Sequence, residues 1–136
     1  MKDIEVFYEN EYIVYSIDRS KALFEVIWKD TTFLREEVFK EIIIKQKEST
    51  LFYRPRKVLI DSTFFDFAID PSLQKWFDDQ IFSATIKSGI QKVGIVISKD
   101  LFAQVSVEQT MEEGQGIMHL TRYFRTYQEA RYWLLN

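Results

Sequence analysis

The segment from residue 57 to 77 (KVLIDSTFFDFAIDPSLQKWF) constrains the fold more than any other part of the chain. It opens with an uninterrupted apolar run at residues 58–60, which is typical of a strand buried on both faces. Asp61, Ser62 and Thr63 stop this run, and Asp70 with Pro71 then opens a helix, because Asp caps helices and Pro suits the first helical position. Ligands of parallel sheets bind at the carboxyl ends of the strands, so we expect the functional edge here.

The flanking segments extend this pattern into a complete α/β domain. Residues 4–8, 12–17 and 22–28 are predicted strands, and a helix is expected to start at residues 30–32 and to fade at 47–49. After the helix that Gly89 closes, we expect a strand at 93–97, a more polar helix to Gly114, a strand at 118–124 and a last helix opened by Thr126 and Glu129. The order β-β-β-α-β-α-β-α-β-α predicts one domain over residues 1–136. That domain is an α/β layered sandwich with about four helices and a mixed sheet of five to six strands, antiparallel at its N-terminal part.

Composition narrows the classes of function. The net charge of −3 argues against a nucleic-acid partner, which usually requires a basic face. The apolar runs are far too short for a membrane span, and the acidic, strand-like N-terminus does not resemble a signal peptide, so we expect a cytoplasmic protein. Without cysteine, disulfides and thiolate chemistry are excluded.

No residue pattern indicates catalysis. His119 is the only histidine, it falls in an expected strand, and no nucleophile elbow accompanies it. Neither a metal-ligand spacing nor a glycine-rich phosphate loop occurs. We therefore expect a non-enzymatic protein with no cofactor and no metal.

Four segments carry a resemblance to a known family. They are VLID, FDFAIDPSLQKW, KVGIVISKDLF and RYFRTYQEARYWL, and they lie within residues 57–135. This half of the chain resembles the SpoIIAA-like branch of the STAS family, which implies a bacterial signalling module that binds protein partners. In that family a Ser or Thr that follows an Asp is the phosphorylation switch. Here the order is Asp70, Pro71, Ser72, so proline occupies the acceptor position and the usual switch is not expected.

Candidate contact residues lie at the strand ends and helix starts. Asp61 and Ser62 either line a crevice or hydrogen-bond to their own loop. Phe65 and Phe67 point the same way and form either a lid on the core or the mouth of an apolar pocket, and Phe102 is expected to face outward. The full set is Asp61, Ser62, Phe65, Phe67, Asp70, Ser72, Ser98, Asp100 and Phe102. These residues predict a binding or regulatory module with a protein partner or a second copy of the chain, and a module for an apolar small molecule or lipid is the alternative.

Overall fold

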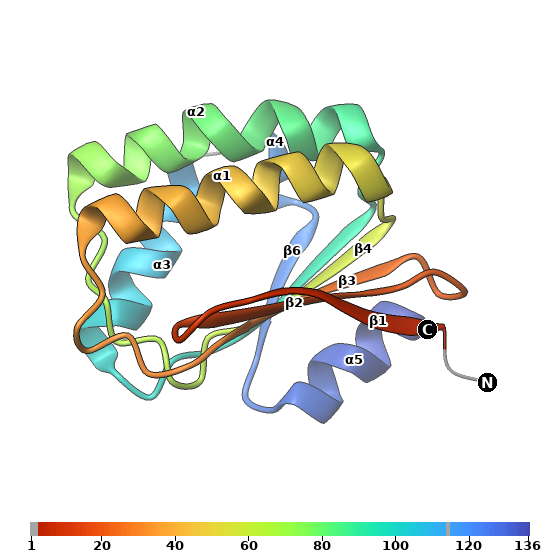
Figure 1. Cartoon of the computed structure of the whole chain (residues 1–136), viewed down its shortest axis with the longest axis horizontal. Coiled ribbons are helices and arrows are strands. Elements are labelled where there is room, and N and C mark those ends of the chain that lie inside the picture. Colours follow the sequence, from red (N-terminus) through yellow and green to blue (C-terminus); the bar gives the residue numbers. More distant parts are fainter. Residues whose placement is uncertain (1–2, 114) are drawn as a thin grey trace.

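The structure is a computed structural model that describes residues 3–113 and 115–136 (Figure 1). Its strands are β1 (Ile4–Glu9), β2 (Ile13–Asp18), β3 (Leu23–Trp28), β4 (Lys57–Asp61), β5 (Lys92–Val96) and β6 (Thr121–Phe124). Its helices are α1 (Glu36–Tyr53), α2 (Pro71–Ser88), α3 (Leu101–Glu113), the four-residue α4 (Gln115–Met118) and α5 (Tyr127–Leu135). The expected element order is confirmed, with α4 as an addition.

One six-stranded sheet contains the strands in sequence order. The first three strands pair antiparallel, whereas β3, β4, β5 and β6 are parallel neighbours. The predicted mixed α/β sheet with an antiparallel N-terminal part is therefore confirmed. Because each crossover steps to the next position in the same direction, right-handed connections place their helices on one face.

Helices cover both faces of the sheet unequally. In Figure 1, α1 and α2 lie above the sheet and α5 lies below it. The larger core fills the space under α1, α2 and α3, and a smaller one joins the other face to α5 through Leu23, Leu59, Val96, Ala130 and Leu134. Among the described residues, no helix is both long and apolar enough to cross a membrane.

The start of the first helix was predicted wrongly. We expected it at residues 30–32, but α1 begins at Glu36, and Arg35 occupies the N-cap position without a side-chain capping bond. Asp30 instead accepts hydrogen bonds from the backbone and hydroxyl of Thr32, which closes a local turn. The helix also continues to Tyr53, past the expected end at 47–49. Polar side chains that look like a cap therefore belong to the preceding loop.

The strand expected at residues 118–124 is shorter than predicted. Only Thr121–Phe124 pair with β5, and α4 occupies residues up to Met118. His119 therefore lies in the turn between α4 and β6, where it is exposed, and not within a strand. The expected helix end at Gly114 lies outside the described residues.

Candidate functional site

The loops after β3, β4 and β5 meet at one end of the sheet and enclose an open groove of about 400 Å³. We call this end, formed by residues 29–35, 62–70 and 97–102, the carboxyl edge. Its groove is lined by Asp30, Thr63, Phe64, Phe65, Asp66, Lys99 and Asp100. The edge expected from the strand ends therefore contains a concave surface, as parallel sheets commonly do.

A hydrogen-bonded link between Thr31 and Asp66 joins the first two loops. The Asp66 carboxylate accepts bonds from the Thr31 backbone (3.0 Å) and hydroxyl (2.6 Å), and it lies 2.8 Å from the Thr32 hydroxyl, whose one proton it shares with Asp30. The Thr31 hydroxyl accepts a bond from the Asp66 backbone in return (2.9 Å). Partial burial alone would raise the pKa of Asp66, but these hydrogen bonds outweigh it and hold the pKa below its usual value. Asp66 therefore carries a negative charge at neutral pH.

Asp61 and Ser62 stabilise the start of the loop after β4. Asp61 Oδ1 accepts bonds from the backbone (3.0 Å) and hydroxyl (2.6 Å) of Thr63. Ser62 is buried, and its backbone joins Val96 and Phe65. The interpretation of Asp61 as a loop-stabilising residue is confirmed, and neither side chain lines the groove.

Asp70 and Ser72 organise the start of α2. Asp70 accepts a bond from the backbone of Leu73 (3.0 Å) and one from the Ser72 hydroxyl (2.9 Å). Both bonds lower the pKa of Asp70, and the bond from Leu73 has the larger effect. The predicted N-cap with Pro71 at the first helical position is confirmed. Ser72 lies in the first helical turn, as expected.

Phe65 and Phe67 close the core under the carboxyl edge. Phe65 is buried, with its ring centroid 4.7 Å from that of Trp28, and Phe67 stacks on Phe39 at 5.1 Å. The interpretation of these two rings as a core lid is confirmed. Phe64 points outward, where Lys99 Nζ lies 4.9 Å from its ring centroid. Period-two spacing thus separated the buried rings from the exposed one.

Ser98 and Asp100 fasten the third loop. The Ser98 hydroxyl donates to the Phe65 carbonyl and accepts from the Asp100 backbone (3.0 Å). Asp100 in turn accepts from the backbone of Ala103 (2.8 Å), so it caps α3. Both residues position the edge, and Asp100 also lines its groove.

Helix α3 exposes apolar side chains at its start and buries polar ones further along, beside the buried Ala103 and Met111. Its apolar residues Leu101 and Phe102 are 72% and 79% exposed, so the outward orientation predicted for Phe102 is confirmed. Its polar residues Ser106 and Thr110 are buried. The reason is that the Ser106 hydroxyl accepts a bond from the backbone of Ile69 (3.0 Å), a group that the β4–α2 loop leaves inside. The helix therefore presents apolar side chains to solvent.

A cavity of about 50 Å³ lies between the sheet and α1, α2 and α3. Its walls are mostly apolar, with Ser62, Gln46 and Thr110 as polar exceptions. Pockets for small molecules usually measure about 300–1,000 Å³. The space that the core leaves open is therefore far smaller than a typical ligand site.

Two further observations concern catalytic and metal chemistry. His119 is exposed, and it does not line the groove or the cavity. Within residues 3–113 and 115–136, no three His, Asp or Glu side chains are grouped as metal ligands.

Sequence reasoning missed several residues of this edge. Asp30, Thr31 and Asp66 were not assigned to it, because the first two were interpreted as a helix start. Lys99 was also missed. The only signal available was the unusual density of polar residues at 30–32 and 61–66, which does not reveal that the two loops meet. Of the predicted contact residues, the structure brings Phe65 and Asp100 together in the groove and leaves the others beside it or under it.

The fold is an α/β domain in which β3 to β6 are parallel neighbours joined by helical crossovers. Its carboxyl edge is concave and partly apolar. Comparisons with protein-family models, with curated proteins and with solved structures give no significant match for this chain.

Proposed function

We propose that the protein is a non-enzymatic, STAS-like binding module that docks a protein partner on its carboxyl edge. One observation carries this proposal: each of three successive loops exposes large apolar side chains at the same end of the sheet. Phe33 is 84% exposed and Phe64 58%, and the third loop contributes Leu101 and Phe102. Exposed apolar residues gathered in one place are typical of interaction sites.

The energetics of these side chains favour a partner. Burying one such ring contributes about 1.5–3 kcal/mol. A surface helix normally turns its large apolar side chains toward the core. Helix α3 instead exposes Leu101, Phe102 and Val105 to solvent and buries Ser106. Covering this side of α3 is therefore the simplest role for it.

Charge indicates the chemistry of the partner. Asp30, Asp66 and Asp100 line the groove, and Lys99 is the only cation among its lining residues. Each carboxylate is already oriented by hydrogen bonds, from its own loop for Asp30, from the neighbouring loop for Asp66 and from the start of α3 for Asp100, and can accept further ones. We infer a partner surface with an arginine or lysine between apolar side chains, because arginine forks match carboxylates well.

The resemblance to SpoIIAA-like proteins supports a regulatory role. Pro71 occupies the position of the family's phosphorylated residue, and the Ser72 hydroxyl is already bonded to Asp70. We infer that partner binding here does not depend on phosphorylation of this helix start. The alternative, an apolar small-molecule or lipid-binding module, receives less support from a cavity of about 50 Å³.

Site-specific photo-crosslinking in the native cells tests the proposal. Benzoylphenylalanine replaces Phe102 in one variant and Phe52 in the control, because Phe52 is nearly as exposed (77%) but lies at the opposite end of α1. We expect a discrete protein adduct from position 102 and little from position 52. Adding Phe33→Ser and Phe64→Ser should lower the adduct yield at least tenfold.

The mass of the adduct identifies the occupant. An adduct of twice the chain mass indicates a second copy, and any other mass indicates a different protein. Equal yields from positions 102 and 52, or a yield that ignores the two serine substitutions, would contradict docking at the carboxyl edge.

A further inference from the structure

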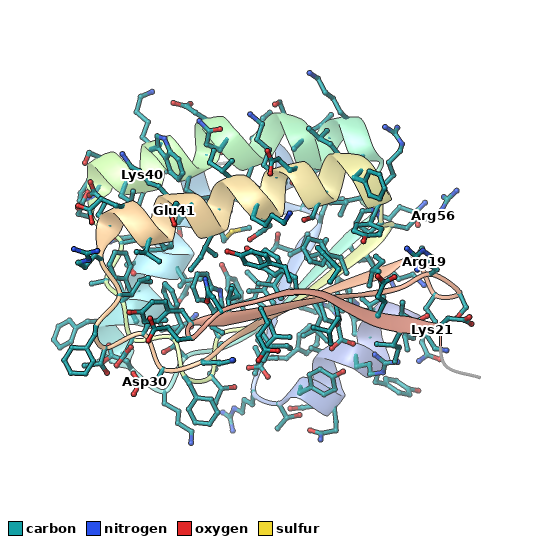
Figure 2. All side chains as sticks on the ribbon, in the orientation of Figure 1. Arg19, Lys21, Asp30, Lys40, Glu41 and Arg56 are labelled. Carbon is teal, nitrogen blue, oxygen red and sulfur yellow. The ribbon has the colours of Figure 1, made fainter. Side chains whose placement is uncertain are left out.

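A second surface lies at the opposite end of the sheet, where the parallel strands begin. We call it the basic end. Figure 2 shows Arg19, Lys21 and Arg56 there, far from Asp30 at the carboxyl edge. Arg54 follows α1 and Lys87 lies in the last turn of α2, and both helices finish at this end. All five cations of the basic end are exposed.

Backbone and side-chain contacts hold these segments together. The Arg56 backbone donates to the carbonyl of Ala22 in the β2–β3 hairpin (2.9 Å). Arg54 Nη2 donates to the carbonyl of Lys87 (2.9 Å). The guanidinium carbon of Arg19 lies 5.5 Å from the ring centroid of Tyr53. Three segments that are distant in sequence therefore present their cations on one surface.

Few carboxylates neutralise this surface. Arg19 pairs with Glu5 at 2.7 Å, and the buried Asp18 carboxylate lies beside Lys21, whose backbone donates to it (3.2 Å). The other ion pairs of the described residues join Lys29 to Glu9, Arg35 to Glu37 and Arg131 to Glu25. None of them involves Lys21, Arg54, Arg56 or Lys87. Although the whole chain has a net charge of −3, this end is positive.

Exposed apolar side chains stand among the cations. Phe52, in the last turn of α1, is 77% exposed, and Ile86, in the last turn of α2, is 51% exposed. Cations near a helix C-terminus stabilise the helix dipole, and this role alone can explain Arg54 and Lys87. It explains neither Lys21 and Arg56, which lie outside helices, nor the apolar residues between them.

We propose that the basic end binds the surface of an anionic lipid membrane, with Phe52 and Ile86 entering the interface. Cations attract the anionic headgroups, and the apolar tips bury in the acyl boundary. Nucleic acid fits less well, since Ile86 has no aromatic face for base stacking. This orientation turns the acidic carboxyl edge away from the anionic lipids and leaves it free for a partner.

Vesicle flotation of the full chain tests this site directly. The probes are vesicles of phosphatidylcholine with 30% phosphatidylserine and vesicles of phosphatidylcholine alone. We expect binding to the anionic vesicles only, weakened by salt because exposed charges are screened. The variant Lys21→Gln, Arg56→Gln, Lys87→Gln should lower the partition coefficient by about fivefold per cation, or about 100-fold in total.

A matched control separates the site from net charge. Arg35→Gln, Lys75→Gln, Arg125→Gln removes three equally exposed cations elsewhere and should bind like the wild type. Phe52→Ser should lower binding about tenfold, since it removes one apolar ring. Three results would each overturn the proposal. The wild type fails to bind the anionic vesicles, both triple variants lose binding equally, or the protein prefers a 20-base-pair DNA duplex to the vesicles. None of these results bears on the carboxyl edge.

Discussion

The link between Thr31 and Asp66 provides the sharpest test of how the carboxyl edge is built. Replacing Thr31, a residue that is 1% exposed, by Val keeps the side-chain shape but removes the hydroxyl. Two hydrogen bonds are lost: the donation to the Asp66 carboxylate at 2.6 Å and the acceptance from the Asp66 backbone at 2.9 Å.

The cost follows from the kind of bonds that are lost. A hydrogen bond to a charged group contributes about 1.5–3 kcal/mol, and a neutral one about 1 kcal/mol. Asp66 is exposed, so water replaces part of what it loses. We therefore expect Thr31→Val to lower the free energy of unfolding by about 2–3 kcal/mol, against a total of about 5–15 kcal/mol for a typical domain.

Urea unfolding followed by tryptophan fluorescence measures this loss. The control is Thr32→Val, whose hydroxyl bonds the same carboxylate at 2.8 Å but is exposed, so we expect a loss below about 1 kcal/mol. A loss under about 0.5 kcal/mol for Thr31→Val, or equal losses for both variants, would refute the reasoning.

The same pair predicts a dependence on pH. The pKa of Asp66 is lower in the folded chain than its ordinary value of 3.8. Its ionic contribution to stability is therefore present above that value and is lost as the pH falls through the lower, folded pKa. The difference between wild type and Thr31→Val should shrink below about pH 4. A difference that grows on acidification would contradict the assignment.

The remaining predictions concern α5. The one proton of the Tyr127 hydroxyl is shared by the two carboxylate oxygens of Glu25 (2.8 and 2.9 Å), and Tyr127→Phe should cost about 1–2 kcal/mol in urea unfolding. Burial, with the bond to Glu25, raises the pKa of Tyr127 to about 12, so Glu25→Gln should lower it in an ultraviolet titration; an unchanged value would argue against this contact. Gly94→Ala should cost about 1–3 kcal/mol, because its Cβ would lie 3.2 Å from Leu134 Cδ1. Partial recovery of this loss by Leu134→Val would support crowding, and no recovery would contradict it.

Local patterns in the sequence determined the order of elements and the class of fold. Apolar runs such as residues 58–60 marked the buried strands, and Asp70 with Pro71 marked the start of α2 to the residue. Such signals are reliable because the side-chain pattern of a strand and the bonds of a helix cap involve residues only a few positions apart. The same local logic failed at residues 30–32, where residues able to cap a helix bond to Asp66 and to each other instead.

Only the tertiary structure decided which residues share a surface. Thr31 and Asp66 are 35 positions apart, and no periodicity records that their loops meet. The orientation of α3 was also undetermined locally, because the backbone of Ile69 needs the Ser106 hydroxyl and this requirement turns Leu101 and Phe102 outward. Cations scattered from position 19 to position 87 become one surface because parallel strands begin at the same end of a sheet. The sequence alone therefore specified the scaffold, and long-range packing specified which residues share the carboxyl edge and the basic end.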